Sequence, residues 1–335
     1  MASFERQHSA GRANDGTPPD RPQRLPRAAV PGRPARMARG PLTIGDPAPA
    51  VEVRLAAAEP YRPDSIADGG SAFGLAARAA SVRGLYKRYL GAPRQDDLCL
   101  GLHEPSHTLI AAVADGVSSA PRSHLGAALA VRHAAAAVAR QLDDGVDELR
   151  WEEVFKHAAW ALVDEQRRAD GGADAGVEAA AASLATTLVV AAITAAPSET
   201  GGDGNCDPAE DERTPRVQLA AVGDSPAFLL GDGAFKAIAG GFDSPDALLG
   251  GGVQALPRST RPAYRDARML EPGQALLLCT DGLALPLAGG ASEVGPIFAR
   301  ELSSPPDVLD FARLLDFSRS TYDDDRTLVA VWCQP

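Results

Sequence analysis

The chain has 335 residues, of which 45% are hydrophobic and 23% are charged, and its net charge at pH 7 is −11. These proportions are ordinary for a soluble globular protein and exclude a wholly disordered chain. No collagen-like or heptad repeat runs through the sequence, which excludes a fibrous protein. The acidic balance argues against a general nucleic-acid binder, because affinity for a duplex depends on Lys and Arg that neutralise phosphates.

The first 50 residues differ from the rest of the chain, because they hold eight Arg against four acidic residues, and nine of the 27 prolines. Such a segment buries too little apolar surface to offset its conformational entropy. We therefore expect residues 1–60 to form a disordered basic tail rich in Pro and Arg, and residues 75–335 to form the folded domain. No apolar stretch follows a basic start, so no secretory signal is expected.

Hydrophobic periodicity predicts the elements of the domain in chain order. Strands are expected over residues 107–114, 186–194, 217–222, 227–230, 235–239, 275–280 and 327–333. Helices are expected over residues 123–142, 151–169 and 308–319. Strands that come in pairs, with helices that come in pairs, indicate a layered α+β fold. Residues 197–216 are polar and acidic and contain Gly and Pro, which predicts an exposed loop insertion.

Residues 179–196 carry no charge over about the length that spans a bilayer. Ala, Ser and Thr dominate there, and the β-branched run from Thr186 to Thr194 is typical of a buried strand, so we expect no membrane span. The four cysteines lie far apart without a C-x-x-C pair, which excludes a zinc ribbon and indicates reduced thiols. Together these features favour a cytoplasmic protein.

Aspartates recur at the ends of the expected strands. Asp115 and Asp281 each follow an apolar strand and precede a Gly, which would let the backbone turn sharply and expose its carbonyl. Asp96 and Asp324 each stand just before a strand, and Asp224 follows another in Gly-Asp-Ser. Each aspartate taken alone is best explained as a turn residue. As a set, converging carboxylates repel one another unless a hard cation lies between them, and oxygen-only ligation indicates Mg²⁺ or Mn²⁺.

Six motifs follow one another along the chain: QDD (95–97), VADG (113–116), SLATTLVVA (183–191), AAVGDSPAFLL (220–230), LLLCTDGL (276–283) and DDDRTLVAV (323–331). In this order the sequence resembles the metal-dependent protein serine/threonine phosphatases of type 2C, in particular their compact bacterial branch. The resemblance spans roughly residues 80–335. No single motif is diagnostic, but six in sequence argue against coincidence.

The resemblance implies an αββα sandwich, in which two central antiparallel sheets are flanked by pairs of helices. It also implies a site for two Mg²⁺ or Mn²⁺ ions at one edge of the sheets. By position, Asp115 would bridge both metals and the carbonyl of Gly116 would bind one of them. Asp281 and Asp324 would bind the other, with Asp325 as the alternative to Asp324 because the run of aspartates leaves the register open by one residue.

Two further aspartates match residues of the family's site. Asp96 matches the acidic residue that orients the attacking water, and Asp224 matches the residue linked to a third, weaker metal. Two cations about 3.5–4 Å apart would lower the pKa of a water between them and hold the phosphate oxygens, so no covalent enzyme intermediate is needed. Consistently, no cysteine in the sequence is followed six residues later by Arg.

The sequence departs from the family's pattern at several positions. Gln95 stands where an acidic residue is common, Val117 follows the first Asp-Gly where His is common, and Pro226 replaces an Arg after Gly-Asp-Ser. An upstream Arg often binds the phosphate. Arg88 and Arg94 are both candidates for this role, although neither is at the usual offset, and a surface salt bridge explains each equally well.

The favoured hypothesis is a metal-dependent hydrolase that removes phosphate from phosphoserine and phosphothreonine in proteins during signalling, so its partner would be a phosphorylated protein. The rival is a catalytically weak pseudophosphatase that serves as a phosphoprotein-binding or regulatory module. A third, weaker hypothesis is a phosphatase for small phosphoesters.

Overall fold

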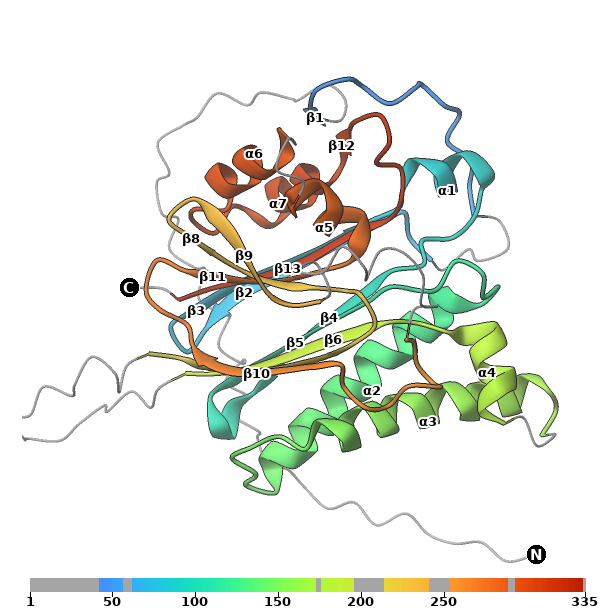
Figure 1. The fold of residues 1–335 in the computed structure, drawn as a ribbon, viewed down its shortest axis with the longest axis vertical. Coiled ribbons are helices and arrows are strands. Elements are labelled where there is room, and N and C mark those ends of the chain that lie inside the picture. The colour runs from blue at the N-terminus through green and yellow to red at the C-terminus, as the bar shows by residue number, and fades with distance from the viewer. Residues whose placement is uncertain are drawn as a thin grey trace, which may run out of the picture. The chain divides into compact units, whose positions relative to one another are not determined.

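The computed structural model describes residues 42–56, 62–172, 176–195, 214–240, 254–288 and 293–333. Two antiparallel β-sheets lie face to face, and helices cover the outer face of each sheet (Figure 1). The predicted αββα sandwich is thereby confirmed.

The first sheet has five strands in the order β10-β7-β6-β5-β4. They are β4 (Asp97–His103), β5 (Thr108–Ala114), β6 (Leu188–Thr194), β7 (Arg216–Val222) and β10 (Tyr264–Met269). The second sheet has six strands in the order β2-β3-β13-β11-β8-β9. They are β2 (Ser65–Ala72), β3 (Leu75–Val82), β8 (Ala227–Gly231), β9 (Ala234–Ala239), β11 (Ala275–Cys279) and β13 (Arg326–Cys333). A short parallel pair joins β1 (Leu42–Thr43) to β12 (Phe317–Ser318).

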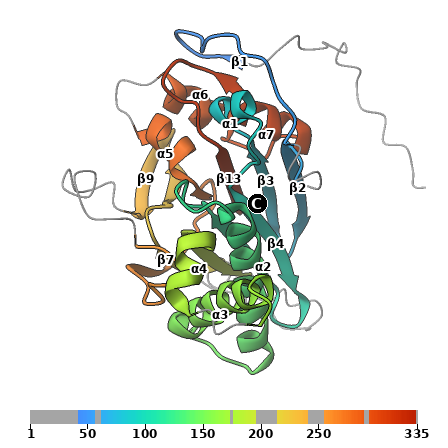
Figure 2. The same cartoon turned by 90° about the vertical axis from the view of Figure 1, so that its right-hand side faces the viewer.

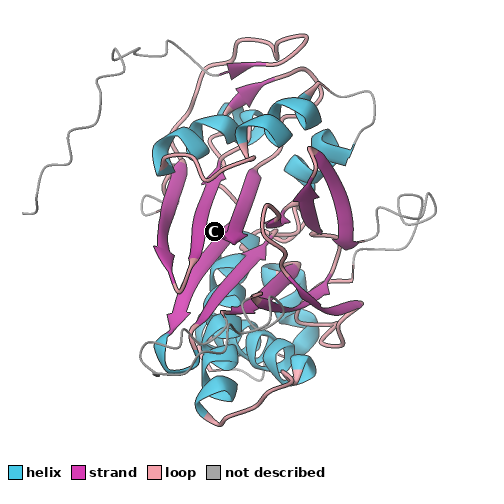
Figure 3. Ribbon diagram, turned by 90° about the vertical axis from the view of Figure 1, so that its left-hand side faces the viewer, coloured by secondary structure: helices cyan, strands magenta, loops and turns pink. Residues whose placement is uncertain are grey.

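The helices fall into two layers, with the strands between them (Figure 3). The five-stranded sheet is covered by α2 (Ser123–Asp143), α3 (Trp151–Ala169) and α4 (Val177–Leu184). The six-stranded sheet is covered by α5 (Asp281–Ala288), α6 (Val294–Glu301) and α7 (Val308–Leu315). Figure 2 shows these two groups on opposite sides of the strands, with the short helix α1 (Leu85–Leu90) next to α6 and α7 in this view.

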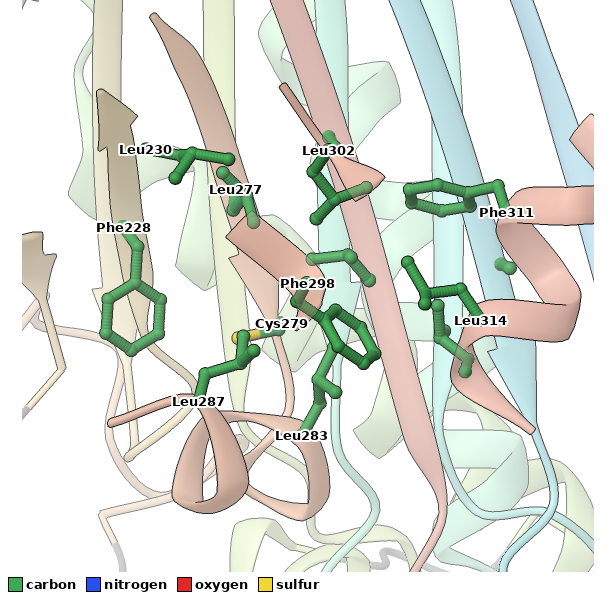
Figure 4. Close-up of a cluster of buried hydrophobic side chains, with 14 of the residues drawn as sticks. Phe228, Leu230, Leu277, Cys279, Leu283, Leu287, Phe298, Leu302, Phe311 and Leu314 are labelled. Atoms are coloured by element: carbon green, nitrogen blue, oxygen red, sulfur yellow. The ribbon is translucent and has the colours of Figure 1, made fainter. Parts of the chain in front are cut away.

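Apolar side chains fill the space between the layers. The cluster between the two sheets includes Leu109, Val189, Leu219, Leu276 and Val329, all at most 3% exposed. The cluster under α5, α6 and α7 is built from larger side chains (Figure 4), among them Phe228, Leu277, Leu283, Phe298 and Phe311. Burial of each such side chain contributes about 1.5–3 kcal/mol, so these clusters hold the sandwich together.

The central strands β5 and β6 are buried along nearly their whole length. One face of each contacts the other sheet and the opposite face contacts α2, which explains why both sequences are continuously apolar. The strand expected from residue 186 begins only at Leu188, because the hydroxyls of Thr186 and Thr187 form hydrogen bonds with the backbone of Asp115.

The folded domain begins earlier than the sequence predicts. Residues 42–56 were expected within the disordered tail, yet Leu42–Thr43 forms a strand and Ile44 is 2% exposed in the core under α6 and α7. Ile44 is an isolated apolar residue among Pro and Gly, and for this reason composition alone missed it. Residues 1–41 and most of the expected loop insertion, 196–213, lie outside the described residues, so both remain predictions.

Two boundaries near the C-terminus also differ. The helix expected over residues 308–319 ends at Leu315, because Phe317 and Ser318 pair with β1 as β12. Within the described ranges no helix is both long and apolar enough to cross a membrane, and residues 188–194 form a strand.

One glycine makes a contact on which the helix layer depends. A Cβ on Gly126 of α2 would lie 1.9 Å from the carbonyl oxygen of Leu184, at the end of α4.

We expect Gly126→Ala to lower the free energy of unfolding by about 1–3 kcal/mol, because α2 and α4 must separate, despite the better helix propensity of Ala. Gly101→Ala is the control, since the nearest atom, Cβ of Ile110, would be 3.8 Å away. Urea unfolding measures both, and equal stability of the two variants would contradict the prediction.

Candidate active site

The backbone of Asp115 is held by two threonines of the SLATTLVVA motif. Its N–H donates to Oγ1 of Thr187 at 3.0 Å, and its carbonyl oxygen accepts from the Thr187 N–H and from Oγ1 of Thr186, both at 2.8 Å. Asp115 directly follows the last residue of β5, so its side chain leaves a rigid element at a fixed point. The sequence pattern identifies these threonines only as part of a motif, whereas the structure shows that they hold the backbone of Asp115.

Thr187 also connects Asp115 to the Gly-Asp-Ser motif. The hydroxyls of Thr187 and Ser225 lie 2.6 Å apart, and both residues are buried. Gly223 has φ +98° and lies so close to Thr187 that a Cβ would come within 2.7 Å of it. The positive φ and the close approach both require Gly. The motif therefore places Asp224, half-buried, beside the end of β7.

The second Asp-Gly pair opens a helix. Asp281 is the first residue of α5, immediately after β11 and Thr280. A Cβ on Gly282 would lie 2.1 Å from the carbonyl oxygen of Asp325, and one on Gly116 would lie 2.8 Å from the carbonyl oxygen of Gln95. Neither glycine has a positive φ. Glycine is required at both positions because another backbone segment passes directly over them.

Asp96 lies at the centre of the acidic residues and is 1% exposed. Its Oδ2 accepts hydrogen bonds from Oγ1 of Thr280 and from Oγ1 of Thr327, both at 2.8 Å. These hydroxyls come from the end of β11 and the start of β13, so Asp96 joins the five-stranded sheet to the six-stranded one. Burial, together with the charge of Asp325, raises the pKa of Asp96 to about 7.

The side chains of Asp115 and Asp281 interact with each other. Burial together with the charges of Asp96 and Asp281 raises the pKa of Asp115 well above its ordinary value. Burial and the charge of Asp281 also raise the pKa of Asp224. The strongest influences on both groups thus come from burial and from other carboxylates, as expected where a cation is needed to stabilise the ionised forms.

Asp324 and Asp325 have different surroundings. Asp325 is 1% exposed, and its two oxygens accept hydrogen bonds from the backbone N–H of Gly84 at 2.7 Å and of Gln95 at 2.6 Å. Asp324 has a side chain that is half exposed, and its charge acts on Asp115 and Asp96. The backbone bonds of Asp325 are those of a structural residue, which favours Asp324 as the residue that faces the cluster.

Lys87, which was not among the residues predicted for the site, forms ion pairs with both of these aspartates. Nζ of Lys87 forms a close ion pair with Asp324 and lies 3.1 Å from Oδ2 of Asp325. Burial alone would lower the pKa of Lys87, but the charges of Asp325 and Asp324 raise it above its ordinary value. No sequence signal singles this residue out, except that only three of the 33 basic residues are Lys.

The two arginines proposed for phosphate binding are engaged in other contacts. Arg94 is 1% exposed, and its Nη1 donates to Oγ of Ser81 at 2.6 Å and to the carbonyl oxygen of Asp96 at 2.5 Å. Arg88 donates to Asp64 at 2.7 Å and to Asp316 at 2.8 Å. The ion pairs of Arg88 match the salt-bridge alternative, but Arg94 is buried and its closest contacts are hydrogen bonds to a hydroxyl and a carbonyl, so a surface salt bridge is wrong for Arg94. A phosphate-binding role for either residue remains a prediction that these contacts do not support.

The donor set determines which metal the site could hold. Over the ranges that the structure describes, no three His, Cys, Asp or Glu side chains are arranged to hold one metal ion together. Two carboxylates, Asp115 and Asp281, do meet, and their oxygens suit a hard cation such as Mg²⁺ or Mn²⁺. The donors of Asp115 and Asp281 thus suit a hard cation, whereas Oδ1 of Asp324 pairs with Lys87.

The family model of protein phosphatase 2C matches residues 83–321, which include Asp96, Asp115, Asp224 and Asp281 but neither Asp324 nor Asp325. The chain belongs to this family. Among curated protein sequences, none matches it significantly.

Solved structures with a similar fold include serine/threonine phosphatases. The phosphatase PstP/Ppp of Mycobacterium tuberculosis is 20% identical, with a TM-score of 0.47 over 78% of this chain and 99% of the other. The catalytic domain of PstP in complex with two manganese ions is 20% identical, with a TM-score of 0.49 over the same shares. A phosphatase of Toxoplasma gondii is 16% identical, with a TM-score of 0.49 over 81% of this chain and 96% of the other.

The raised pKa of Asp96 predicts how stability depends on pH. Because the folded-state pKa of about 7 exceeds the unfolded value near 4, the folded state holds this proton more tightly, so the stabilisation is complete below about pH 4 and is lost as pH rises toward 7. We expect the melting temperature of the metal-free protein to fall over this range relative to Asp96→Asn. Mn²⁺ should reduce this difference, because a cation stabilises the ionised form.

Differential scanning calorimetry of both proteins between pH 4.5 and 8 measures this difference. A melting temperature of the metal-free wild type that rises with pH relative to Asp96→Asn would contradict the assignment.

Proposed function

We propose that this protein is a metal-dependent phosphatase that hydrolyses phosphoserine and phosphothreonine in other proteins. The observation that carries the proposal is the pair formed by Asp115 and Asp281, which two different sheets bring together at the ends of β5 and β11. Family membership supports the reaction class, and the surrounding carboxylates support the need for a cation.

In this proposal Asp115 and Asp281 hold the cation, and burial together with the charges of Asp96 and Asp281 raises the pKa of Asp115. A divalent cation there would supply the positive charge that a phosphate dianion needs, and would make water acidic enough to attack at neutral pH. The carbonyl of Gly116 is the proposed further ligand from the same loop. Asp224 lies near Asp281 and is the proposed residue of a weaker, additional ion.

In this proposal Asp96 receives a proton from the attacking water. Its Oδ2 is occupied by the hydroxyls of Thr280 and Thr327, which leaves Oδ1 to accept a hydrogen bond from the attacking water. Burial and the charge of Asp325 raise the pKa of this carboxyl group above its ordinary value, which favours proton uptake. The two threonines fix the orientation of the carboxyl plane, so Oδ1 keeps one direction during the reaction.

One observation favours the rival function, a pseudophosphatase that binds phosphoprotein without turnover. Lys87 pairs with Asp324, and Gln95 donates from Nε2 to Oγ of Ser123 at 2.9 Å in place of an acidic residue near the metal. Such a module would bind a phosphoprotein with a fixed stoichiometry that Asp281→Ala does not alter. Absence of turnover at millimolar Mn²⁺, together with such binding, would establish the rival.

The proposed activity is tested on a phosphothreonine peptide with Mn²⁺. We expect Asp115→Asn and Asp281→Asn each to lower kcat/KM at least about 100-fold, equivalent to about 2.7 kcal/mol, because each removes a charge that holds the cation. Asp232→Asn is the matched control, since Asp232 also precedes a Gly but lies in the exposed turn between β8 and β9.

Addition of a chelator should abolish the activity and excess Mn²⁺ should restore it. Full activity in the presence of the chelator, or after Asp115→Asn, would exclude the mechanism. A comparison with nucleotide substrates distinguishes a protein phosphatase from a phosphatase for small phosphoesters.

A further inference from the structure

The helix α1 turns its charged side chains toward the protein and its apolar side chains toward solvent. Lys87 is its buried residue, and Arg88 is half-buried and forms ion pairs with two aspartates. Tyr86, Tyr89 and Leu90 are 46–57% exposed. These three residues stand at positions i, i+3 and i+4, so they share one face of the helix. This arrangement is the inverse of an ordinary amphipathic helix, which buries its apolar face.

The segment that precedes β2 continues this exposed apolar surface (Figure 1). Val53 and Leu55 are exposed, and Arg54 between them holds the segment against α1. The N–H of Arg54 donates to the carbonyl oxygen of Arg88 at 2.9 Å, and its guanidinium lies 5.3 Å from the ring centre of Tyr89. Exposed apolar side chains from two separate segments are thus gathered in one place.

Helix α1 begins beside the loop that carries the aspartates at the start of β13. The N–H of Tyr86 donates to the carbonyl oxygen of Asp323 at 3.1 Å. The same loop contacts the start of α5, because a Cβ on Gly282 would lie 3.4 Å from Cβ of Asp324. Gly282 directly follows Asp281 of the candidate active site. A single loop therefore connects the exposed face of α1 to the active site.

A cluster of exposed apolar side chains indicates a surface that a partner covers. Tyr and Arg, which this surface contains, are among the residues that most often anchor protein interfaces. A phosphorylated substrate reaches both places at once, since its phosphorylated residue must enter the active site. Six helical residues span about 9 Å, and an extended peptide advances about 3.3 Å per residue. A substrate residue three or four positions from the phosphorylated one can therefore contact this face of α1.

We propose that Tyr86, Tyr89 and Leu90 bind an apolar side chain of the phosphoprotein substrate, three or four residues away from the phosphorylated residue. This assignment rests on the proposed function and adds a sequence preference to it. Ion pairs of Lys87 and Arg88 hold the helix from its other face, so the three side chains stand on a fixed element. Burial of an apolar substrate side chain against them lowers KM and leaves the chemical step unchanged.

The test compares kcat/KM of the full-length protein, with Mn²⁺, for three phosphothreonine peptides. The first has Leu at the third and fourth residues before the phosphothreonine, the second has Leu at the third and fourth residues after it, and the third has Ser at all four positions. At least one Leu peptide should exceed the Ser peptide about tenfold or more, through KM. The double variant Tyr86→Gln/Tyr89→Gln should reduce this ratio to about twofold or less.

Trp160→Gln is the matched control and should keep the ratio of the wild type, because Trp160 is an exposed aromatic residue on α3, in the opposite helix layer (Figure 2). The ratio compares substrates of one protein sample, so it does not depend on the fraction of a variant that folds. If the double variant has no activity, Leu90→Gln replaces it, with the same expected fall in the ratio.

Equal hydrolysis of the three peptides by the wild type, or a ratio that the Tyr86 and Tyr89 variants leave unchanged, would overturn the role of this surface while the proposed function stands. A wild type that hydrolyses none of the peptides would instead contradict the proposed function. Analytical ultracentrifugation distinguishes a second copy of the chain as the partner. A wild-type dimer that the double variant no longer forms would assign the surface to that copy and overturn the proposal.

Discussion

Repulsion between carboxylates is the constraint around which the site is built. Asp96, Asp115 and Asp281 come from the ends of strands in two sheets. Burial and the charges of nearby carboxylates raise the pKa of Asp96 and that of Asp115. Hydrogen bonds hold these residues in place despite the repulsion: two threonine hydroxyls donate to Asp96, and the hydroxyl of Thr187 accepts the backbone N–H of Asp115. The fold thus stabilises a local charge distribution that is unfavourable without a cation.

The stabilising contacts come from all layers of the sandwich. The core under α5 to α7 sets the position of β11 and β13, and the core under α2 to α4 sets that of β5 and β6 (Figure 1). Close backbone approaches at Gly116 and Gly282 then bring the ends of these strands together. Lys87 adds a positive charge to this acidic set, because its ammonium group forms an ion pair with Asp324.

Much of this could be predicted from the sequence, because the central strands are buried on both faces and are therefore continuously apolar. Asp115 and Asp281 were identified for the same reason, as they directly follow such strands. The apolar pattern typical of a strand is weaker in β2, with the sequence SIADGGSA, and in β10, with YRDARM. Both are edge strands and are largely exposed. The ion pair between Lys87 and Asp324 could not be predicted. It depends on where a six-residue helix places one side chain relative to a loop more than 230 positions away in the chain.

A crystal structure of the protein grown with Mn²⁺, measured at the manganese absorption edge, tests the central claim most directly. An anomalous peak should lie between the carboxylates of residues 115 and 281, within about 2.5 Å of an oxygen of each. At saturating Mn²⁺, a map without a peak at this position, or with these two carboxyl groups turned away from each other, would contradict the account.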